Sequence, residues 1–331
     1  MSNNVLIFRT DKIGDLLISC PAIITIKKNI NDSKITIITS KNNYEYAKNL
    51  KIFDIVHKFP EKNLFKKIEF ILKLIKNKYK YIFVFDGKER SIISACLIKS
   101  NCKVALASKI NFFYKIFKVK FFIDSENTNL NEIFQKFIKY SNINATISNF
   151  DFLKNKIDNN FSSKISINNY LHIHLDEKWF SNIYIKKYTD IKPSYSEFIE
   201  FLDKICEKND ILITTGLVNF NLIDDLKVKY FNKINDKIFI KKSGNKSVYL
   251  VYKPTFDDLE SLLRNSKTLI SCHGAITHAS NSFNVKKIDI LEKSKVSFYR
   301  RFTSYLTDYH TIYRSNFNSV KSEIYKKILN F

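Results

Sequence analysis

The residues of this sequence that could do chemistry lie in short polar segments, each placed where an apolar run gives way to a helical pattern. The first follows the apolar run 5–8 and contains Lys12, Gly14 and Asp15. A carboxylate at a helix N-terminus is stabilised in its ionised form by the helix dipole, so Asp15 could accept a proton as a general base. The same position suits an ordinary helix N-cap, and the sequence pattern alone favours that interpretation.

The second polar segment, 171–179, contains the chain's only tryptophan, Trp179, directly after Lys178. A lysine ammonium could bind a diphosphate there as a point charge, and Trp179 could pack over the floor of a ligand cleft. His172 and His174 alternate along the preceding strand with a spacing that could hold a metal ion. Because no third ligand is evident, we predict hydrogen-bonded histidines and no metal site.

The third segment, 270–279, runs from an apolar strand through a turn of small residues into a helix. The free amides of such a turn form an anion site in many nucleotide-binding α/β proteins. Tight packing of the helix on the strand would explain the glycine and the alanines but not the two histidines, so we favour the functional interpretation. The candidate anion-binding residues are His273, Gly274, Ala275, Thr277 and His278.

Two further stretches give weaker signals. The turn after the apolar strand 81–85 offers Asp86, Lys88 and Arg90 to an anionic molecule. The stretch 110–123 mixes six aromatic residues with lysines, which suits a membrane surface or the stacking of nucleic-acid bases. A core strand and an amphipathic helix would account for about half of its residues on pattern alone. Neither G-x-G-x-x-G nor G-x-x-x-x-G-K-[ST] occurs, which argues against a dinucleotide dehydrogenase and a P-loop nucleotide hydrolase.

Strand-like and helix-like patterns alternate along the chain, which predicts parallel sheets with helices on both faces. A polar stretch at 154–168, rich in Asn and Ser, interrupts the alternation and marks the expected linker. We therefore predict an α/β protein of two Rossmann-like, doubly wound domains, 1–160 and 161–331, facing across a cleft. The last helix, 320–329, could pack back on the first domain. The expected strands are 5–9, 35–39, 81–85, 103–107, 118–123, 170–175, 210–215, 248–252, 268–272 and 287–291.

The net charge of +23 is unevenly spread, because residues 1–150 carry 26 Lys and Arg against 12 Asp and Glu, or +14. Such a field favours anionic partners such as nucleic acid, a phosphorylated sugar or an acidic membrane surface. A general abundance of lysine that only solvates the surface is an equally good explanation. The five cysteines are scattered without a C-x-x-C pair and predict reduced, buried side chains of a cytosolic protein. No apolar run approaches the roughly 20 residues of a membrane span.

These segments, in order and over nearly the whole length, resemble glycosyltransferase family 9, the heptosyltransferase family of bacterial lipopolysaccharide assembly. The specific likenesses are the opening VLIFRTDKIGDLLISCPAI, with Gly-Asp before an apolar helix, and SCHGAITHAS, a strand–turn–helix that ends in a histidine. LHIHLDEKWF resembles the segment that opens the family's second domain, and ITIITS and YIFVFDGKERS resemble strands of its first.

The resemblance implies a GT-B fold and an inverting, metal-independent transfer from a nucleotide-sugar, typically ADP-heptose, to a lipid-linked acceptor, with no separate cofactor. By position, Asp15 would be the general base that deprotonates the acceptor hydroxyl, and Lys178 would meet the donor diphosphate. The turn 273–277 and His278 would hold the nucleotide-sugar. The expected acceptor-binding residues are Lys12, Asp86, Lys88 and Arg90.

The sequence departs from the family pattern at two places. His273-Gly274-Ala275 stands where the family usually has Asp-Ser/Thr-Gly, and 291–294 reads Leu-Glu-Lys-Ser where Gly-Pro-Thr is usual. The family's aspartate is associated with the sugar end of the donor, so the resemblance leaves the transferred sugar open.

We therefore expect a cytoplasmic glycosyltransferase of lipopolysaccharide or surface-glycan synthesis that takes an anionic, lipid-linked glycan as acceptor and no nucleic acid. Peripheral contact with the inner face of the cytoplasmic membrane stays open. Two alternatives remain: a nucleic-acid-binding protein that uses the basic first domain, and a non-catalytic protein resembling family 9.

Overall fold

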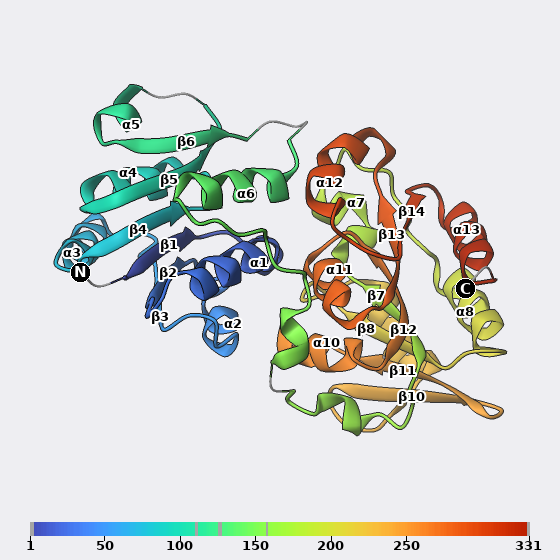
Figure 1. Ribbon diagram of the computed structural model, residues 1–331. Coiled ribbons are helices and arrows are strands. Elements are labelled where there is room, and N and C mark those ends of the chain that lie inside the picture. The colour runs from blue at the N-terminus through green and yellow to red at the C-terminus, as the bar shows by residue number, and fades with distance from the viewer. Residues whose placement is uncertain (1–2, 110–111, 125–127, 157, 330–331) are drawn as a thin grey trace. The chain divides into compact units, whose positions relative to one another are not determined.

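Two compact units make up the computed structural model, which describes residues 3–109, 112–124, 128–156 and 158–329 (Figure 1). Unit 1 consists of Met1–Phe152 and Arg300–Tyr305, and unit 2 of Leu153–Tyr299 and Leu306–Phe331. Each unit has its own sheet, in agreement with the predicted α/β class. The polar stretch 154–168, expected as a linker, falls within the bounds of unit 2, where Phe161 and Ile165 are buried against the sheet.

The sheet of unit 1 has six parallel strands in the order β3-β2-β1-β4-β5-β6. Strands β2 and β3 lie on one side of β1, and strands β4, β5 and β6 lie on the other side. The loops that leave the carboxyl ends of β1 and β4 therefore diverge, which is where doubly wound sheets bind ligands. The strands are β1 (Val5–Arg9), β2 (Ile35–Thr39), β3 (Ile55–Lys58), β4 (Tyr79–Val84), β5 (Ser100–Ala107) and β6 (Val119–Ile123).

Both faces of this sheet are apolar, because successive strand residues point to opposite faces and are hydrophobic on each of them. Leu6 and Phe8 point to a core that includes Ile92 of α4. On the other face, the ring of Phe85, directly after β4, packs edge-on against Phe134 of α6 at 4.9 Å between centroids. The helices of unit 1 are α1 (Ile13–Asn29), α2 (Tyr44–Asn49), α3 (Leu64–Ile75), α4 (Glu89–Leu97), α5 (Phe112–Ile116) and α6 (Leu130–Tyr140).

Unit 2 repeats this winding and adds a hairpin at one edge. Its strand order is β14-β13-β12-β7-β8-β11-β10-β9, so the order reverses between β7 and β12. Strands β10 and β11 are antiparallel and meet at a tight turn where Gly244 has φ +58°, a left-handed conformation that suits glycine. The strands are β7 (Tyr170–Leu175), β8 (Ile211–Thr215), β9 (Asn232–Lys233), β10 (Ile238–Ser243), β11 (Lys246–Val251), β12 (Ser266–Cys272), β13 (Lys286–Leu291) and β14 (Tyr309–Tyr313).

The last helix of the chain packs within unit 2. Phe317 of α13 contacts the rings of Phe198 and Phe201 on α8, and α13 also packs against β14. The segment from the C-terminal half that groups with unit 1 is Arg300–Tyr305 instead. The helices of unit 2 are α7 (Ser181–Tyr184), α8 (Tyr195–Cys206), α9 (Asn221–Asp225), α10 (Phe256–Leu263), α11 (Ala275–Ser280) and α13 (Phe317–Leu329), and α12 (Val296–Thr303) continues into the unit 1 segment.

Every strand expected from the sequence is present, with shifts of at most three residues at its ends. The sequence analysis missed β3, β9, β10 and β14. Strands β3 and β14 are short and partly exposed, so they lack the long apolar run that announces a buried strand. The helix expected after the turn of small residues in the segment 270–279 runs from Ala275 to Ser280 and continues as a single 3₁₀ turn, Asn281–Phe283.

The five cysteines all lie within the described residues and form no disulfide, and four of them are buried. In the part of the chain that the structure describes, no helix combines the length and the apolar character needed to cross a membrane.

Substitution of Phe134 by Ala should lower the free energy of unfolding by about 3–5 kcal/mol, because the removed ring is fully buried and leaves a cavity between α6 and the sheet. Chemical denaturation measures this change. Phe65→Ala is the matched control: its ring is 83% exposed on α3, and its loss should cost less than about 0.5 kcal/mol. Equal effects of the two changes would contradict the packing described for α6.

Candidate functional site

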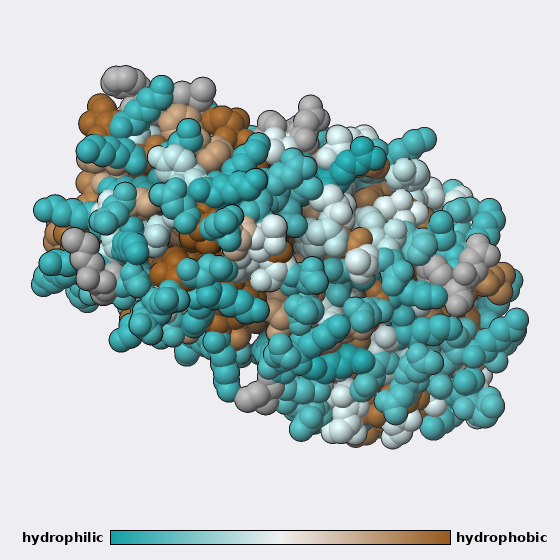
Figure 2. All heavy atoms as spheres, viewed as in Figure 1, coloured by the Kyte–Doolittle hydropathy of each residue, from teal (hydrophilic) through white to brown (hydrophobic). Residues whose placement is uncertain are grey.

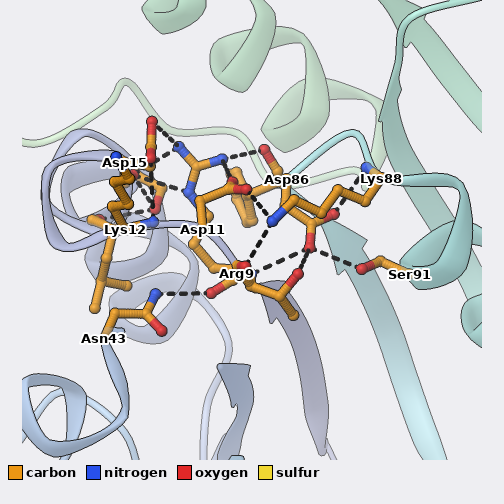
Figure 3. A network of polar contacts seen from close by, with 12 residues as sticks. Arg9, Asp11, Lys12, Asp15, Asn43, Asp86, Lys88 and Ser91 are labelled. Atoms are coloured by element: carbon orange, nitrogen blue, oxygen red, sulfur yellow. Dashed lines mark hydrogen bonds and ion pairs between the residues drawn. The ribbon is translucent and has the colours of Figure 1, made fainter. Parts of the chain in front are cut away.

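A buried arginine organises the loops at the carboxyl edge of the sheet of unit 1 (Figure 3). Arg9, the last residue of β1, is only 3% exposed. Its Nε and Nη2 donate to the backbone carbonyl of Asp15 at 2.8 and 2.6 Å, and its Nη1 donates to the carbonyl of Phe85 and to the Asp11 carboxylate. One guanidinium thus joins the end of β1, the first turn of α1 and the end of β4.

Asp15 lies in the first turn of α1 with its side chain 39% exposed. One carboxylate oxygen, Oδ2, accepts a hydrogen bond from the backbone N–H of Lys12 at 3.2 Å, which is half of a capping-box arrangement. The other, Oδ1, lies 4.0 Å from Nη2 of Arg9. Asp15 is therefore the third residue of α1 and not its N-cap, which is Lys12, and it closes the first turn while presenting a partly exposed carboxylate beside a fixed cation. This capping-box role and the general-base interpretation are compatible.

Asp11 and Lys88 form an ion pair beside Arg9 (Figure 3). Nζ of Lys88 also donates to the backbone carbonyl of Thr10 at 2.6 Å. Burial raises the pKa of the Asp11 carboxyl above its ordinary value, and Arg9 and Lys88 offset only part of that effect. Lys88, a predicted acceptor-binding residue, is thus already engaged in holding the two loops together.

Asp86 ties the β4 loop to the β1 loop. Its Oδ2 accepts hydrogen bonds from the backbone N–H and the hydroxyl of Thr10, and from the hydroxyl of Ser91 at 2.7 Å. Arg90 donates to the Thr10 hydroxyl at 3.2 Å, and its exposed guanidinium lies over the ring of Phe59. The structure therefore brings Asp86, Lys88 and Arg90 together with the Asp15 segment, and it gives Asp86 a positioning role.

The sequence analysis assigned no role to Asp11 or Arg9. Arg9 could have been recognised as important because it is a charged residue at the end of an otherwise apolar strand. Such a residue must find partners within the fold, because a buried charge without them is too costly. Lys12, predicted to bind the acceptor, is exposed at the start of α1.

In unit 2 a partly buried lysine has a corresponding role. Lys178 follows β7 and pairs with Asp176, and its Nζ donates to the backbone carbonyl of His273 at 3.1 Å. Its Nζ also lies 3.5 Å from the carbonyl of Cys272, the last residue of β12. Burial alone would lower the pKa of Lys178, but the Asp176 carboxylate raises it above its ordinary value. The cation thus joins the loops at the reversal between β7 and β12.

Gly274 leaves the space that this lysine occupies. A Cβ at position 274 would lie 2.6 Å from Nζ of Lys178, closer than carbon and nitrogen can approach without a covalent bond. Gly274 has an extended backbone, with φ −174°, so the requirement is for space and not for an unusual conformation. Two predicted donor-binding residues, Lys178 and Gly274, are therefore in direct contact.

His273 is held by a carboxylate from the next strand. Its Nδ1 lies 2.7 Å from Oδ2 of Asp289, a fully buried residue of β13, and the hydroxyl of Tyr309 donates to the same oxygen at 2.8 Å. The carboxylate therefore fixes Nδ1 of His273 as a donor and leaves Nε2 as the other polar atom of the ring. Thr277 accepts a hydrogen bond from the backbone N–H of Gly274 at 3.3 Å, which stabilises the turn.

His278 is buried beneath His273, with the two rings edge-on at 5.0 Å between centroids. Burial, together with the positive charge available at His273 and Lys178, lowers its pKa well below the ordinary value. A neutral His278 thus packs inside the unit, and its place is that of a support for the turn. Ala275 begins α11 directly after Gly274.

Trp179 does not line a cleft. It is fully buried in the core, and its Nε1 donates to the backbone carbonyl of His174 at 3.0 Å, so the expectation of a cleft-floor role is wrong. His172 and His174 are the hydrogen-bonded strand histidines that the sequence predicts, because both share the Thr214 hydroxyl at 2.8 and 2.9 Å. Among the described residues, no group of three or more His, Cys, Asp or Glu side chains is placed to hold a metal ion.

Arg314, which follows β14, is a second cation at this edge that the sequence analysis missed. Its Nε donates to the backbone carbonyl of Thr189 at 2.7 Å, and its Nη1 lies 3.6 Å from Sγ of Cys272. Its Nη2 is buried and has no hydrogen-bond partner among the described residues. Arg314 comes from a strand that was itself not predicted, so its proximity to Cys272 could not be inferred.

Two other features lie apart from these residues. A cavity of about 430 Å³ in unit 2 is lined by Phe180, Lys192, Pro193, Phe220 and Asp225 among others, and by none of the predicted donor-binding residues. The aromatic stretch 110–123 falls partly outside the described residues. In its described part, Tyr114 and Val119 are buried, as the alternative of a core strand and helix requires.

No protein-family model and no curated protein sequence matches this chain. Solved structures do match it. "E. coli heptosyltransferase WaaC with ADP" is similar with a TM-score of 0.69 and 12% identity over 99% of this chain and 99% of that chain. The fold is that of a GT-B glycosyltransferase.

Two further structures place this fold in a wider group. A glycosyltransferase family 9 protein from Veillonella parvula DSM 2008 matches with a TM-score of 0.68 and 11% identity, over 99% of this chain and 89% of that chain. The UDP-GlcNAc 2-epimerase from Methanocaldococcus jannaschii matches with a TM-score of 0.57 and 14% identity, over 99% and 92%. The resemblance to family 9 is thus confirmed at the level of the fold, which glycosyltransferases and epimerases share.

The buried histidines of unit 2 should make the protein less stable in mild acid. Burial lowers the pKa of His174 to about 3, and it lowers the pKa values of His172 and His278 well below the ordinary value. The unfolded chain therefore binds protons that the folded chain excludes, and stability that is complete above about pH 6.5 is lost as the pH falls. At one pH unit below that value, each histidine should cost about 1.4 kcal/mol.

Urea denaturation at pH 7.5 and pH 5.5 measures this loss. The variant His174→Asn is the control, and its stability should depend less on pH than that of the original chain by about one histidine's share. An identical pH dependence in the two proteins would contradict a neutral, buried His174.

Proposed function

We propose that this protein is an inverting, metal-independent glycosyltransferase that transfers a sugar from a nucleotide-sugar to an acceptor of lipopolysaccharide or surface-glycan synthesis. The observation that carries the proposal is the Asp15 carboxylate: it is partly exposed, it lies at the switch point of a doubly wound sheet, and Arg9 fixes the turn that bears it. The fold shared with a heptosyltransferase that was solved with ADP supports the same reaction class.

Asp15 is the proposed general base. In a single displacement, a carboxylate oxygen of Asp15 removes the proton from the acceptor hydroxyl while the oxygen of that hydroxyl attacks the anomeric carbon of the donor. The bond from the anomeric carbon to the nucleoside diphosphate breaks in the same step, and the configuration inverts. The capping hydrogen bond occupies Oδ2, so Oδ1, which is not held by the helix, is the atom proposed to take the proton.

Unit 2 is proposed to bind the donor. The leaving diphosphate needs positive charge, and Lys178 and Arg314 supply two cations beside the carboxyl end of β12. Lys178 is neutralised in part by Asp176, whereas Arg314 has one nitrogen without a protein partner in the described structure. The turn at Gly274, Ala275 and Thr277 would complete the site for the nucleotide-sugar, with ADP-heptose as one candidate donor.

His273 is proposed to contact the sugar. The resemblance places an aspartate at this position, and here a histidine oriented by Asp289 replaces it. A carboxylate only accepts hydrogen bonds at neutral pH, whereas Nε2 of a histidine whose Nδ1 is protonated accepts one bond and can donate only as the cation. The number of hydroxyl groups that this position can bind is therefore smaller, which favours a donor sugar other than that of the typical family member.

Substitution of Asp15 by Asn should abolish most of the transfer, because the amide keeps the size of the side chain but cannot accept the acceptor's proton. We expect a fall of about 10²- to 10⁴-fold in the rate of transfer, with folding and nucleotide binding unchanged. Chromatography of labelled acceptor measures the transfer. The control Asp32→Asn removes a carboxylate from the exposed turn after α1 and should leave the rate unchanged. Full activity of Asp15→Asn would refute the proposed base.

A thermal-shift panel of ADP-, UDP-, GDP- and CMP-sugars should identify the donor. A ligand present at about a hundred times its dissociation constant adds about 2.7 kcal/mol to the stability of the protein, which is readily detected. Stabilisation by one nucleotide class, weakened in Arg314→Gln, is the expected result. Epimerisation of a UDP-sugar, or tight and salt-sensitive binding of nucleic acid with no response to any nucleotide-sugar, would overturn the proposal.

A further inference from the structure

The most unusual surface of unit 1 is an apolar face of helix α3. Leu64 and Phe65 are 68% and 83% exposed, and Leu72 is 54% exposed. Together with Ile68 and Ile75, which are also exposed, these side chains lie within an arc of about 100° on a helix of 3.6 residues per turn. Soluble proteins scatter single hydrophobic residues over their surfaces, but a row of five on one helix face indicates a surface that contacts something apolar.

This arc is not the one that holds the helix to its unit. The opposite side of α3 carries Phe70, whose ring packs edge-on against Phe59 at 5.8 Å, and Leu74, which is buried. Helix α3 therefore has two apolar sides, of which one is used by the fold. The exposed side continues onto α4, which packs beside α3 and exposes Ile93 and Leu97. Figure 2 shows apolar residues at the left-hand margin, where Figure 1 places α3 and α4.

Lysines border the exposed arc. Residues 62–80 contain seven lysines and a single acidic residue, Glu69, which pairs with Lys73 at 2.8 Å. At about 100° per residue, Lys76 lies about 20° beyond the edge of the arc that Phe65 forms, and Lys73 and Lys66 lie about 80° and 100° beyond that edge on the same side. Acidic residues are also absent from the sequence that follows, since no Asp or Glu occurs between Ser91 and Ile123. An apolar stripe beside a dense row of lysines is the composition of helices that lie in the interface of an anionic membrane.

We propose that the exposed face of α3, extended by α4, docks unit 1 on an anionic lipid bilayer. The apolar side chains would enter the boundary between headgroups and acyl chains, and the lysines would meet the lipid phosphates. A second copy of this chain fits the face less well, because a symmetric contact would bring the lysines of both copies together. Nucleic acid fits less well because the arc has one aromatic ring, Phe65, and is otherwise aliphatic.

This surface differs from the aromatic stretch 110–123, which the sequence singled out for membrane contact. That pattern counted buried residues such as Tyr114, whereas the apolar residues of α3 recur at the helical spacing that is typical of a core-facing amphipathic helix. Only the structure shows which side of α3 packs against the rest of unit 1 and which side is exposed. The proposal does not depend on the proposed glycosyl transfer, because lipid binding is measured without donor or acceptor.

Flotation with vesicles tests the proposal. The full chain should float with vesicles of phosphatidylcholine and phosphatidylglycerol, and about tenfold less with phosphatidylcholine alone, and added salt should weaken the binding. The variant F65S/L72S should lose at least about tenfold in binding to the anionic vesicles, because it removes two of the exposed apolar side chains of the arc. The variant K66E/K76E should lose a similar factor and should also lose the salt dependence.

The matched control is L217S/V228S, which removes two side chains of unit 2 that are 78% and 80% exposed. It should bind vesicles as the original chain does, and all variants should keep the original melting temperature because only exposed side chains change. Equal vesicle binding by F65S/L72S and the control would overturn the proposal. So would a dimer of the original chain that F65S/L72S converts to a monomer in size-exclusion chromatography, since a second copy would then occupy the face.

Discussion

The guanidinium of Arg9 is the interaction on which the geometry of unit 1 depends. A charge so deeply buried is stable only if its donors are all matched, and here the partners come from three separate parts of the chain. The carbonyl of Asp15, the carboxylate of Asp11 and the carbonyl of Phe85 are each drawn to one planar group. The first turn of α1 therefore cannot move relative to β4 without leaving a buried cation unpaired. A base that must act on a bound hydroxyl gains from such rigidity, because misplacement by even 1 Å is costly to catalysis.

In unit 2 the loops at the switch point are also held by a cation, which is a lysine instead of an arginine. Its sheet reverses between β7 and β12, and Lys178 bridges the loops there through Asp176 and the carbonyl of His273. An ammonium is compact and needs less space than a guanidinium, and the absence of a side chain at Gly274 is sufficient to admit it. In both units a cation satisfies carbonyl groups that the end of a strand leaves free. The backbone of each switch point is thus held from inside the unit, and the neighbouring side chains remain available for ligands.

The sequence predicts where along the chain the site residues lie, but it does not predict which side chains hold them in place. Alternation of apolar and helical patterns is enough to place Asp15, Asp86, Lys178 and His273 at the carboxyl ends of strands, because parallel strands deliver all of these ends to one edge. The partners are another matter. Asp289 lies on the strand next to His273, and Arg314 follows a strand too short and too polar to be recognised. Trp179 was misassigned for a related reason: its ring is buried by α8 and its neighbours, and no local pattern reports the position of a helix that comes later in the chain.

The contact between His273 and Asp289 couples two positions that lie on different strands. The resemblance leads one to expect an aspartate at position 273. With an aspartate there, two carboxylates would lie within hydrogen-bond distance inside the unit, and they could not both stay ionised. The change would be tolerated only after, or together with, the loss of charge at position 289. Asp289 therefore limits which side chains position 273 can hold, independently of any ligand.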